Sequence, residues 1–361
     1  MSTQIEHDLE SRLETVTDPV LESDVVSLGL VEEITIDEAA GTASVTLNFD
    51  APFSPHETAM GEEIRDVVRA AGYEPDLGIS PPDGQPMLPE VRNVIAVASG
   101  KGGVGKTTVA ANLADGLQQL GARTGLVDGD IHGPNIPEML HTDEQPSVTD
   151  DGTFEPARSG GLKAMSLGHV VPREDDPAAL RGPMIEKFLL ELFDGVEWGP
   201  LDYLVVDLPP GTGDATFSLL QNIAVTGSVI VTTPHEMSVA DARKGLRMFR
   251  THDTPVLGIV ENMSRFACPD CDGTHELFGS GGGETTAEKH SVPLIAEVPL
   301  DPRMNSDEGV QQLPVRSDET AAGEEFRRLA PTVANLVGEV KRRAVAEGKT
   351  IEPSPAEDSC S

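Results

Sequence analysis

The stretch VIAVASGKGGVGKTT at residues 94–108 limits the possible folds of this chain more than any other part of the sequence. A short apolar run leads into a glycine-rich loop with the spacing G-x-x-x-x-G-K-T, from Gly100 to Thr107, and helix-forming residues follow. Glycines in such a loop let backbone N–H groups converge on phosphate oxygens at the positive end of the helix. The stretch therefore predicts a strand, a phosphate-binding loop and a helix, in that order.

The loop and the first turn of the helix are the predicted nucleotide-binding residues. Lys106 should reach the β- and γ-phosphates, and the Thr107 hydroxyl should bind Mg²⁺. Lys101 is a second lysine inside the loop, although one lysine is enough to hold a triphosphate; its ordinary alternative is a solvated loop residue. The full predicted set is Gly100, Lys101, Gly102, Gly103, Val104, Gly105, Lys106, Thr107 and Thr108.

Carboxylates follow two later apolar runs. The stretch LVDGDIHGPN contains Asp128 and Asp130, and LVVDLPPGTGD contains Asp207. A carboxylate at the end of a strand commonly supports the Mg²⁺ of a nucleotide, and a neighbouring carboxylate can orient the attacking water. We expect Asp128 and Asp207 to serve Mg²⁺ and Asp130 to act in hydrolysis; each alone is also compatible with a loop carboxylate or a helix cap.

Seven apolar runs alternate with helical segments after the first 90 residues. Continuous apolar runs between helices indicate strands that are buried on both faces of a parallel sheet. We therefore expect an α/β fold, a mostly parallel sheet flanked by helices, with ligands beyond the carboxyl ends of the strands. The runs are residues 94–99, 124–130, 162–167, 202–210, 228–234, 256–264 and 294–300.

A small α+β domain precedes this sheet. Residues 28–36 and 42–49 alternate like half-buried strands, and the stretch HETAMGEEIRDVVRAAG places its apolar residues on one helical face. A proline-rich segment without periodicity then reads as a linker, and the last residues, which include Cys360, read as a disordered tail. The expected organisation is a domain over 1–78, a linker over 79–90, the main domain over 91–344 and a tail over 345–361.

The charge balance is extreme, with 61 acidic against 26 basic residues and a formal net charge of −35. The carboxylates are spread along the whole chain, which predicts a protein that stays hydrated and soluble in concentrated salt. The same charge repels nucleic acid and anionic lipid, so we expect neither as a partner. No stretch of about 18 apolar residues occurs, and three cysteines cannot form a disulfide framework. We therefore expect a salt-adapted cytoplasmic protein.

Cys268 and Cys271 form a C-x-x-C pair after the apolar run at 256–264. This spacing can place two thiolates on one metal, but a stable metal or cluster site usually has four ligands, and His275 would supply only a third. Two copies of the chain would supply four thiolates, enough for a bridging [4Fe–4S] cluster or a shared zinc ion. A thioredoxin-like redox pair is a further alternative.

Several motifs resemble a known family. GKGGVGKT, with its additional lysine, resembles the deviant phosphate loop of the MinD/ParA/nitrogenase-reductase class of ATPases. Together, DGDIHGPN, RGPM, LDYLVVDLPPGTGD, VENMS and CPDC resemble the motifs of Mrp/ApbC-type iron–sulfur cluster carriers, over residues 90–340. The first 75 residues, with TDPVLESDVVSLGLV, are similar to the SufT-like domain that is often fused to such carriers.

The resemblance implies a slow ATPase that binds a [4Fe–4S] cluster between the subunits of a homodimer and transfers it to apo iron–sulfur proteins. ATP, Mg²⁺ and the cluster would be its cofactors. Lys101 would cross to the partner's phosphates, Lys106 would act within its own subunit, and Asn262 would contact adenine. Ser54 stands where the SufT-like domain commonly has a cysteine, and a hydroxyl is a poor ligand for soft metals, so we expect that domain to have a docking or structural role.

Two other functions compete with the carrier. One is a MinD/ParA-type ATPase of spatial organisation that acts on membrane or DNA, and the other is a nitrogenase-reductase-like electron donor. The C-x-x-C pair and the absence of a basic patch count against the first. Nitrogenase-reductase-like proteins take their cysteines from widely separated loops, whereas both cysteines here lie in one C-x-x-C pair. The sequence therefore favours the cluster carrier.

Overall fold

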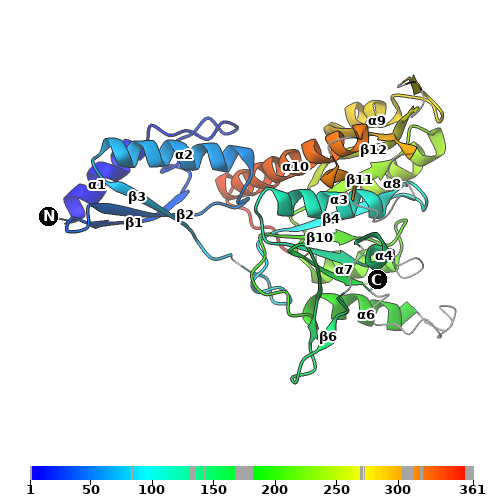
Figure 1. The fold of residues 1–361 in the computed structure, drawn as a ribbon, viewed down its shortest axis with the longest axis horizontal. Helices are drawn as coiled ribbons and strands as arrows, with labels where there is room; N and C mark the ends of the chain where they lie inside the picture. Colours follow the sequence, from blue (N-terminus) through cyan, green and yellow to red (C-terminus); the bar gives the residue numbers. More distant parts are fainter. Residues whose placement is uncertain are drawn as a thin grey trace, which may run out of the picture. The chain divides into compact units, whose positions relative to one another are not determined.

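The computed structural model describes residues 2–82, 84–130, 135–140, 144–166, 182–268, 271, 273–302, 313–317 and 320–353. The chain divides into two compact units, which Figure 1 shows as ribbons. The smaller unit contains Met1–Pro82 with Ala334–Thr350, and the larger contains Asp83–Val333 with Ile351–Ser361. Cys360 lies outside the described residues.

The larger unit is built on a mostly parallel sheet, as the apolar runs predicted (Figure 1). Among its described residues nine strands pair in the order β13-β12-β11-β4-β10-β5-β9-β8, with β14 next to β12. Within this sheet, only the pairs β8–β9 and β12–β13 are antiparallel among the strand pairs described. The strands are β4 (Val94–Ser99), β5 (Thr124–Asp128), β8 (Ala157–Ser159), β9 (Leu162–Ser166), β10 (Tyr203–Asp207), β11 (Gly227–Thr232), β12 (Val256–Ala267), β13 (Thr274–His275) and β14 (Leu294–Leu300).

Helices cover both faces of this sheet. Side chains of α6, α7, α8 and α9 share one buried apolar cluster with alternate residues of the central strands, such as Ala96 and Val206. Helix α3 packs on strands β4, β5 and β10, and it meets α10 closely, because a Cβ added at Gly116 would lie 2.9 Å from the Ala330 Cβ. The helices are α3 (Lys106–Gln119), α4 (Ile136–Leu140), α6 (Gly182–Asp194), α7 (Asp214–Asn222), α8 (Glu236–Thr251), α9 (Gly282–His290), the short η3 (Pro314–Arg316) and α10 (Ala321–Ala346). A separate hairpin pairs β6 (Ser147–Val148) with β7 (Phe154–Glu155).

The smaller unit has the expected α+β character. A three-stranded sheet in the order β1-β2-β3 pairs β1 with β2 antiparallel and β2 with β3 parallel. Apolar residues of α1, α2 and the sheet form its core. The expected strands and helix are present, whereas α1 and β3 had no clear signal in the sequence. The elements are α1 (Ser2–Leu13), β1 (Val31–Asp37), β2 (Thr42–Leu47), α2 (Pro55–Ala70) and β3 (Glu74–Ile79).

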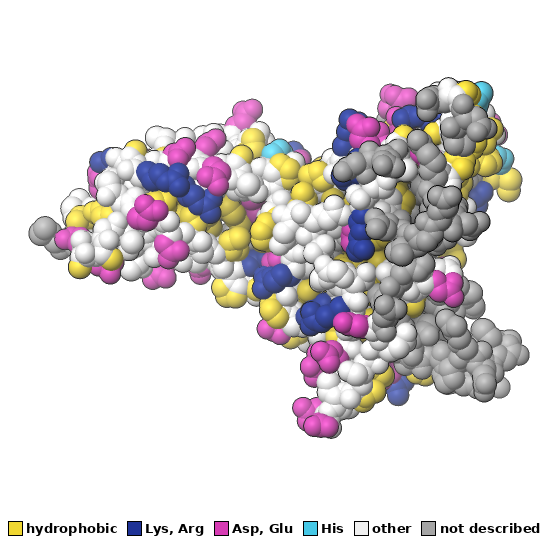
Figure 2. All heavy atoms as spheres, in the orientation of Figure 1, with side chains coloured by type: hydrophobic (Ala, Val, Ile, Leu, Met, Phe, Trp, Pro, Cys, Tyr) yellow, Lys and Arg dark blue, Asp and Glu magenta, His cyan; other side chains and the backbone are white. Residues whose placement is uncertain are grey.

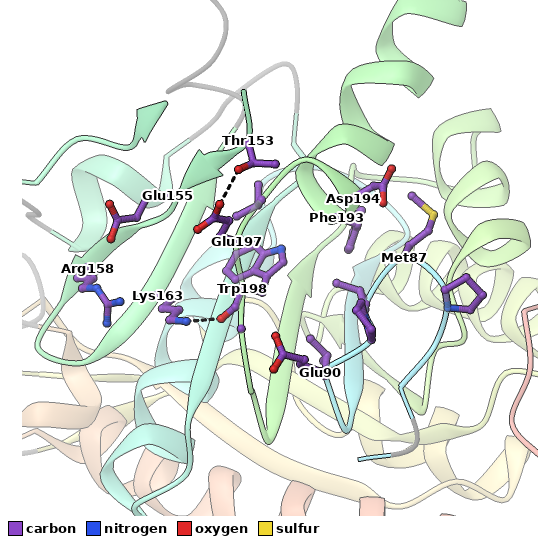
Figure 3. Close-up of a pocket in the computed structure, with 16 residues that line it drawn as sticks. Met87, Glu90, Thr153, Glu155, Arg158, Lys163, Phe193, Asp194, Glu197 and Trp198 are labelled. Atoms are coloured by element: carbon purple, nitrogen blue, oxygen red, sulfur yellow. Dashed lines mark hydrogen bonds between the residues drawn. The ribbon is translucent and has the colours of Figure 1, made fainter. Parts of the chain in front are cut away.

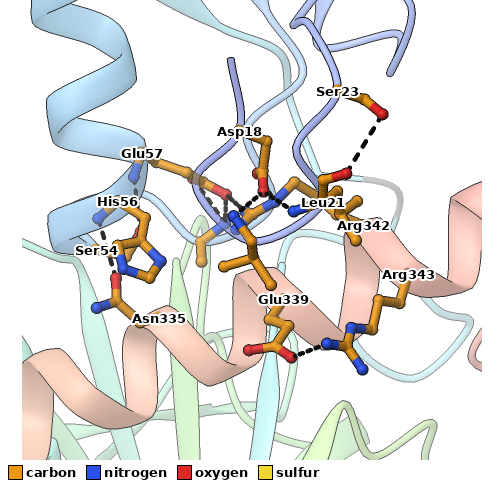
Figure 4. A network of polar contacts seen from close by, with 12 residues as sticks. Asp18, Leu21, Ser23, Ser54, His56, Glu57, Asn335, Glu339, Arg342 and Arg343 are labelled. Atoms are coloured by element: carbon orange, nitrogen blue, oxygen red, sulfur yellow. Dashed lines mark hydrogen bonds and ion pairs between the residues drawn. The ribbon is translucent and has the colours of Figure 1, made fainter.

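The C-terminal part of α10 belongs to the smaller unit. Arg342 on this segment is buried and forms ion pairs with Asp18, at 2.5 Å, and with Glu57, at 2.8 Å (Figure 4). Asn335, also on α10, accepts a hydrogen bond from the His56 backbone N–H at 3.0 Å. The polar contacts of this unit therefore include residues that lie far from the rest of it in the sequence.

Residues 85–90, which were expected to lie within a linker, pack against the larger unit. Gln85 exchanges two hydrogen bonds with the Ala224 backbone, and Leu88 is buried in the main apolar cluster. None of the helices in the described ranges combines the length and the apolar character that a membrane crossing needs. Figure 2 shows acidic side chains scattered over the visible face rather than gathered in one patch, in keeping with their spread along the sequence.

Candidate nucleotide site and cysteine loop

The glycine-rich loop lies between β4 and α3, where the sequence predicted it. Gly103 and Gly105 have φ values of 79° and 83°, a left-handed conformation that L side chains rarely adopt. A Cβ added at Gly105 would lie 2.1 Å from the Asn262 Nδ2, and one at Gly100 would lie 2.1 Å from the Asp241 carbonyl carbon. The glycines are therefore required by backbone conformation and by close packing.

Lys106 and Thr107 meet the end of strand β10. The buried Lys106 Nζ lies 2.6 Å from the Asp207 Oδ1 and 3.9 Å from the Asp130 Oδ2. The Thr107 hydroxyl donates to the other oxygen of Asp207 at 2.6 Å. Burial raises the pKa of Asp207, and the charge of Lys106 opposes that shift. The structure thus brings together four of the predicted catalytic and Mg²⁺ residues, Lys106, Thr107, Asp130 and Asp207.

Asp128 lies beside Asp207 in the sheet but has other partners. It is fully buried at the end of β5 and accepts hydrogen bonds from the Ser166 hydroxyl at 3.0 Å and from the Ile136 and Asp130 backbone N–H groups at 3.2 and 3.1 Å. Burial, together with the charge of Asp207, raises the pKa of Asp128 to about 7. Its contacts in this structure organise the segment that carries Asp130.

The other predicted loop residues line the turn without joining this cluster in the described contacts. Lys101 is half-buried, and its carbonyl accepts a hydrogen bond from the Ser99 hydroxyl at 2.9 Å. Gly102 has open space where a side chain would be, and the Thr108 carbonyl accepts from the Asn112 side chain at 2.8 Å. The loop backbone is therefore held by its own neighbours.

Strand β12 contributes two polar residues near this loop. Asn262, which the resemblance places at adenine, is buried and donates from its Nδ2 to the Val104 carbonyl at 2.9 Å. Sequence reasoning missed its neighbour Glu261, although the motif VENMS contains it. The buried Glu261 carboxylate accepts from the Gly283 backbone N–H in the first turn of α9, and burial raises its pKa.

The cysteine pair lies on the loop after β12. The Cys268 N–H donates to the Gly273 carbonyl at 2.9 Å, which closes the turn; Cys268 is half-buried and Cys271 is exposed. A Cβ added at Gly273 would lie 3.2 Å from the Cys271 Sγ and 3.7 Å from the His275 Nε2, so both side chains border this glycine. In the described part of the chain, no three His, Cys, Asp or Glu side chains are grouped to hold a metal ion.

Ser54 has a structural contact in the smaller unit. It is the N-cap of α2, is fully buried, and its hydroxyl accepts from the Glu57 N–H at 3.3 Å. A serine at an N-cap satisfies a backbone donor that the helix leaves free. The position that a cysteine commonly occupies in the resembled domain is therefore a helix cap in this chain.

A cavity of about 580 Å³ lies in the larger unit, near the amino ends of strands β4 and β9 (Figure 3). Its lining includes Trp198, whose carbonyl accepts from the Lys163 Nζ, and Glu197, which accepts from the Thr153 hydroxyl at 2.7 Å. Burial, together with the charge of Arg158, lowers the pKa of Lys163. These residues lie around the strand starts, away from the phosphate loop, and form no part of the candidate site.

The phosphate loop lies between a buried parallel strand and a helix, and Lys106 and Thr107 face the Asp207 carboxylate at the end of the neighbouring strand in the sheet. This arrangement defines a P-loop NTPase. Comparison with known proteins narrows this class. Residues 90–334 match the family described as NUBPL iron-transfer P-loop NTPase, and residues 6–74 match the iron–sulfur cluster assembly protein family. The chain therefore belongs to the iron–sulfur cluster carrier family of P-loop NTPases, as its motifs predicted.

Individual relatives agree with this assignment. An iron–sulfur cluster carrier protein of Synechocystis sp. is 40% identical over 342 residues, which span 90% of this chain and 96% of that protein. One of Deinococcus radiodurans is 38% identical over 343 residues, 93% of this chain and 95% of that protein. Among solved structures, a nucleotide-binding protein of Archaeoglobus fulgidus in complex with ADP is 34% identical, with a TM-score of 0.51 over 67% of this chain and 88% of that chain.

Proposed function

We propose that the protein binds and slowly hydrolyses ATP, and that a dimer of it carries a [4Fe–4S] cluster to apo iron–sulfur proteins. The observation that carries the proposal is the position of two sites on one sheet. The phosphate loop follows β4 and the cysteine loop follows β12, and both strands run parallel through β11. Their carboxyl ends point to the same edge of the sheet, where open α/β folds bind ligands.

The nucleotide chemistry rests on the Lys106–Asp207–Thr107 cluster. The residues fit Mg²⁺, because the Thr107 hydroxyl and the Asp207 carboxylate are hard oxygen ligands only 2.6 Å apart. The N-terminus of α3 favours the phosphates that the ion would accompany. A bound Mg²⁺ would neutralise charge on the transferred phosphoryl group. Lys106 would exchange its contact with Asp207 for phosphate oxygens, and Asp130, whose Oδ2 lies 3.9 Å from the Lys106 Nζ, would orient the attacking water.

Lys101 acts across the dimer in this proposal. Lys106 contacts Asp207 of its own chain and so serves its own subunit. Lys101, directly after Gly100, is the second lysine of the loop. A cation delivered from a partner stabilises charge that develops in the transition state, so hydrolysis depends on dimerisation. Nucleotide turnover is thereby linked to the assembly that also completes the cluster site.

The cluster is the cargo, and its ligands are thiolates. Each chain offers Cys268 and Cys271 on an accessible loop, and cubane clusters take four thiolates. Two chains supply the complete set, and the exposure of Cys271 leaves the cargo open to a recipient. The smaller unit serves docking or structure rather than cluster binding, because its Ser54 hydroxyl is engaged as a helix cap. Reduced thiols of this kind suit the cytoplasm.

Anaerobic reconstitution with iron and sulfide tests the proposal. The parent protein should hold about four irons per dimer, the content of one cubane bound by four cysteines. Cys268→Ser and Cys271→Ser should each lose the cluster, since a protonated hydroxyl cannot replace a thiolate on iron. Cys360→Ser is the matched control and should change nothing. Zinc at about one per dimer without iron would favour a structural zinc site, and full iron retention in the double variant Cys268→Ser, Cys271→Ser would refute the carrier.

A further inference from the structure

Strand β12 joins the nucleotide loop to the cysteine loop. Near its middle, the Asn262 side chain donates to the Val104 carbonyl of the phosphate loop at 2.9 Å. The strand ends at Ala267, and Cys268 follows directly. Its last residues pair with β13, Phe266 with His275 and Ala267 with Thr274, and so form the base of the turn that carries both cysteines. A shift of this strand end would therefore move the thiol pair.

The strand is irregular between these two contacts. Opposite β14, Asn262 faces Val298 and Phe266 faces Leu300, so three residues of β12 lie opposite one residue of β14. Such bulges recur next to functional sites. Met263, the first residue of the bulge, has a φ of 55°, a left-handed conformation that a bulky side chain adopts only under constraint.

The next residue, Ser264, adds a second energetically unfavourable feature. Ser264 is only 6% exposed, and its hydroxyl has no hydrogen-bond partner among the described residues. A buried hydroxyl without a partner is unfavourable, and backbone strain of this kind persists only where the surroundings impose it. Two independent costs thus fall on neighbouring residues, between the nucleotide loop and the cysteines.

We propose that this bulge, Met263 to Arg265, has two registers against β14, and that nucleotide at the loop bound by Asn262 selects between them. The change of register moves the end of β12 and alters the accessibility of Cys268 and Cys271. Met263 and Ser264 are positioning residues in this account, because they act through the cysteine turn. Its relevance to cluster release rests on the proposed function, but the coupling can be measured on the two thiols of the protein without a cluster.

The test measures the alkylation rates of Cys268 and Cys271 in the full chain by mass spectrometry, with and without Mg-ATP, on a Cys360→Ser background. In the parent, nucleotide should change the rates by about fivefold or more, the lower end of ordinary allosteric coupling. Met263→Gly removes the left-handed strain and Ser264→Ala removes the unpartnered hydroxyl, so both favour the bulged register. Each should reduce the response to less than about twofold, because a register that is favoured in both states no longer shifts.

Two controls separate this coupling from general effects. Met263→Leu keeps the strain and the approximate volume, so it should respond like the parent. Asp253→Gly relieves a similar left-handed residue, with a φ of 50°, in the turn before β12, and it should also respond like the parent. ATP affinity, measured with a fluorescent analogue, should stay within about twofold in the two control variants, whereas it should change in Met263→Gly and Ser264→Ala, because a nucleotide that selects a register is itself bound according to that register.

A parent that shows no nucleotide response, or a Ser264→Ala variant that responds in full, would overturn the proposal. Ser264→Ala decides the matter if Met263→Gly folds poorly, since it only removes a buried oxygen. A chain that shows the thiol response but binds no cluster would refute the proposed function alone. A chain that binds the cluster without the thiol response would refute the coupling alone.

Discussion

Replacing Glu57 by glutamine should remove a pH dependence from the stability of the smaller unit. Glu57 is 1% exposed, accepts from the Ala51 N–H with both oxygens at 3.0 Å, and receives the Arg342 Nη1 at 2.8 Å (Figure 4). Burial raises the pKa of Glu57 from 4.5 to about 7, although Arg342 lowers it in part. The folded unit therefore binds this proton more tightly than the unfolded chain does.

The sign and the size of the effect follow from that shift. A carboxyl group whose pKa is higher in the folded state contributes most stability below its unfolded pKa of 4.5, and this contribution is lost as the pH rises to about 7. A shift from 4.5 to about 7, at 1.36 kcal/mol per pH unit, corresponds to roughly 3 kcal/mol. Glu57→Gln keeps the shape and the bonds that Oε1 accepts from the Ala51 N–H and Arg342, although not the second bond from the Ala51 N–H to Oε2. Glutamine has no proton to lose in this range, so the stability of the variant should lack this decline.

Hydrogen exchange of the buried β2 amides measures the opening free energy of this unit. Between pH 4.5 and 8, after correction for intrinsic exchange, the parent should lose about 3 kcal/mol relative to Glu57→Gln. Glu62→Gln on the same helix is the matched control, because Glu62 is exposed and pairs with Arg65 on the surface. Parallel pH dependences of the parent and Glu57→Gln would refute the reasoning.

Further predictions concern the phosphate loop and the surface charge. Lys106→Ala should abolish ATP hydrolysis and weaken ATP binding, whereas Lys101→Ala should keep most of the binding and lose turnover by about 100-fold or more in a phosphate-release assay. Raising potassium chloride from about 0.1 to 3 M should raise the melting temperature, because the Debye length falls from roughly 10 Å to below 3 Å and the repulsion among 61 carboxylates is screened.

Each of these predictions has a clear contrary result. Hydrolysis at the parent rate in Lys101→Ala would exclude the role across the dimer, and retained turnover in Lys106→Ala would exclude its role at the phosphates. A melting temperature that is unchanged over the whole salt range would remove the argument for salt adaptation.

The features that sequence predicted well are those set by local chemistry. The phosphate loop could be predicted because the left-handed Gly103 and Gly105 and the adjacent lysine lie in one short motif. The contact of Lys106 with Asp207 follows from two strand ends at the same edge of a parallel sheet. Asp128 also lies at that edge, but only the structure shows that it bonds to Ser166 and backbone amides.

The features that sequence could not predict depend on distant partners. Arg342 meets Glu57 across 285 positions, and nothing near either residue indicates the other. The sequence also could not predict that the second half of α10 belongs to the smaller unit. Its helical pattern predicts a buried face but not the unit that buries it. The left-handed Met263 is imposed by the pairing of β12 with β14, since methionine itself favours no such conformation.

Transfer of the cluster to an acceptor tests the central claim most directly. The loaded protein is mixed anaerobically with an apo enzyme whose activity needs a [4Fe–4S] cluster, in the presence of an iron chelator that traps released metal. The account predicts that enzyme activity returns despite the chelator, and that the variant with Cys268→Ser and Cys271→Ser restores none. Recovery that the chelator blocks completely, or that free iron and sulfide match, would contradict direct transfer from this protein.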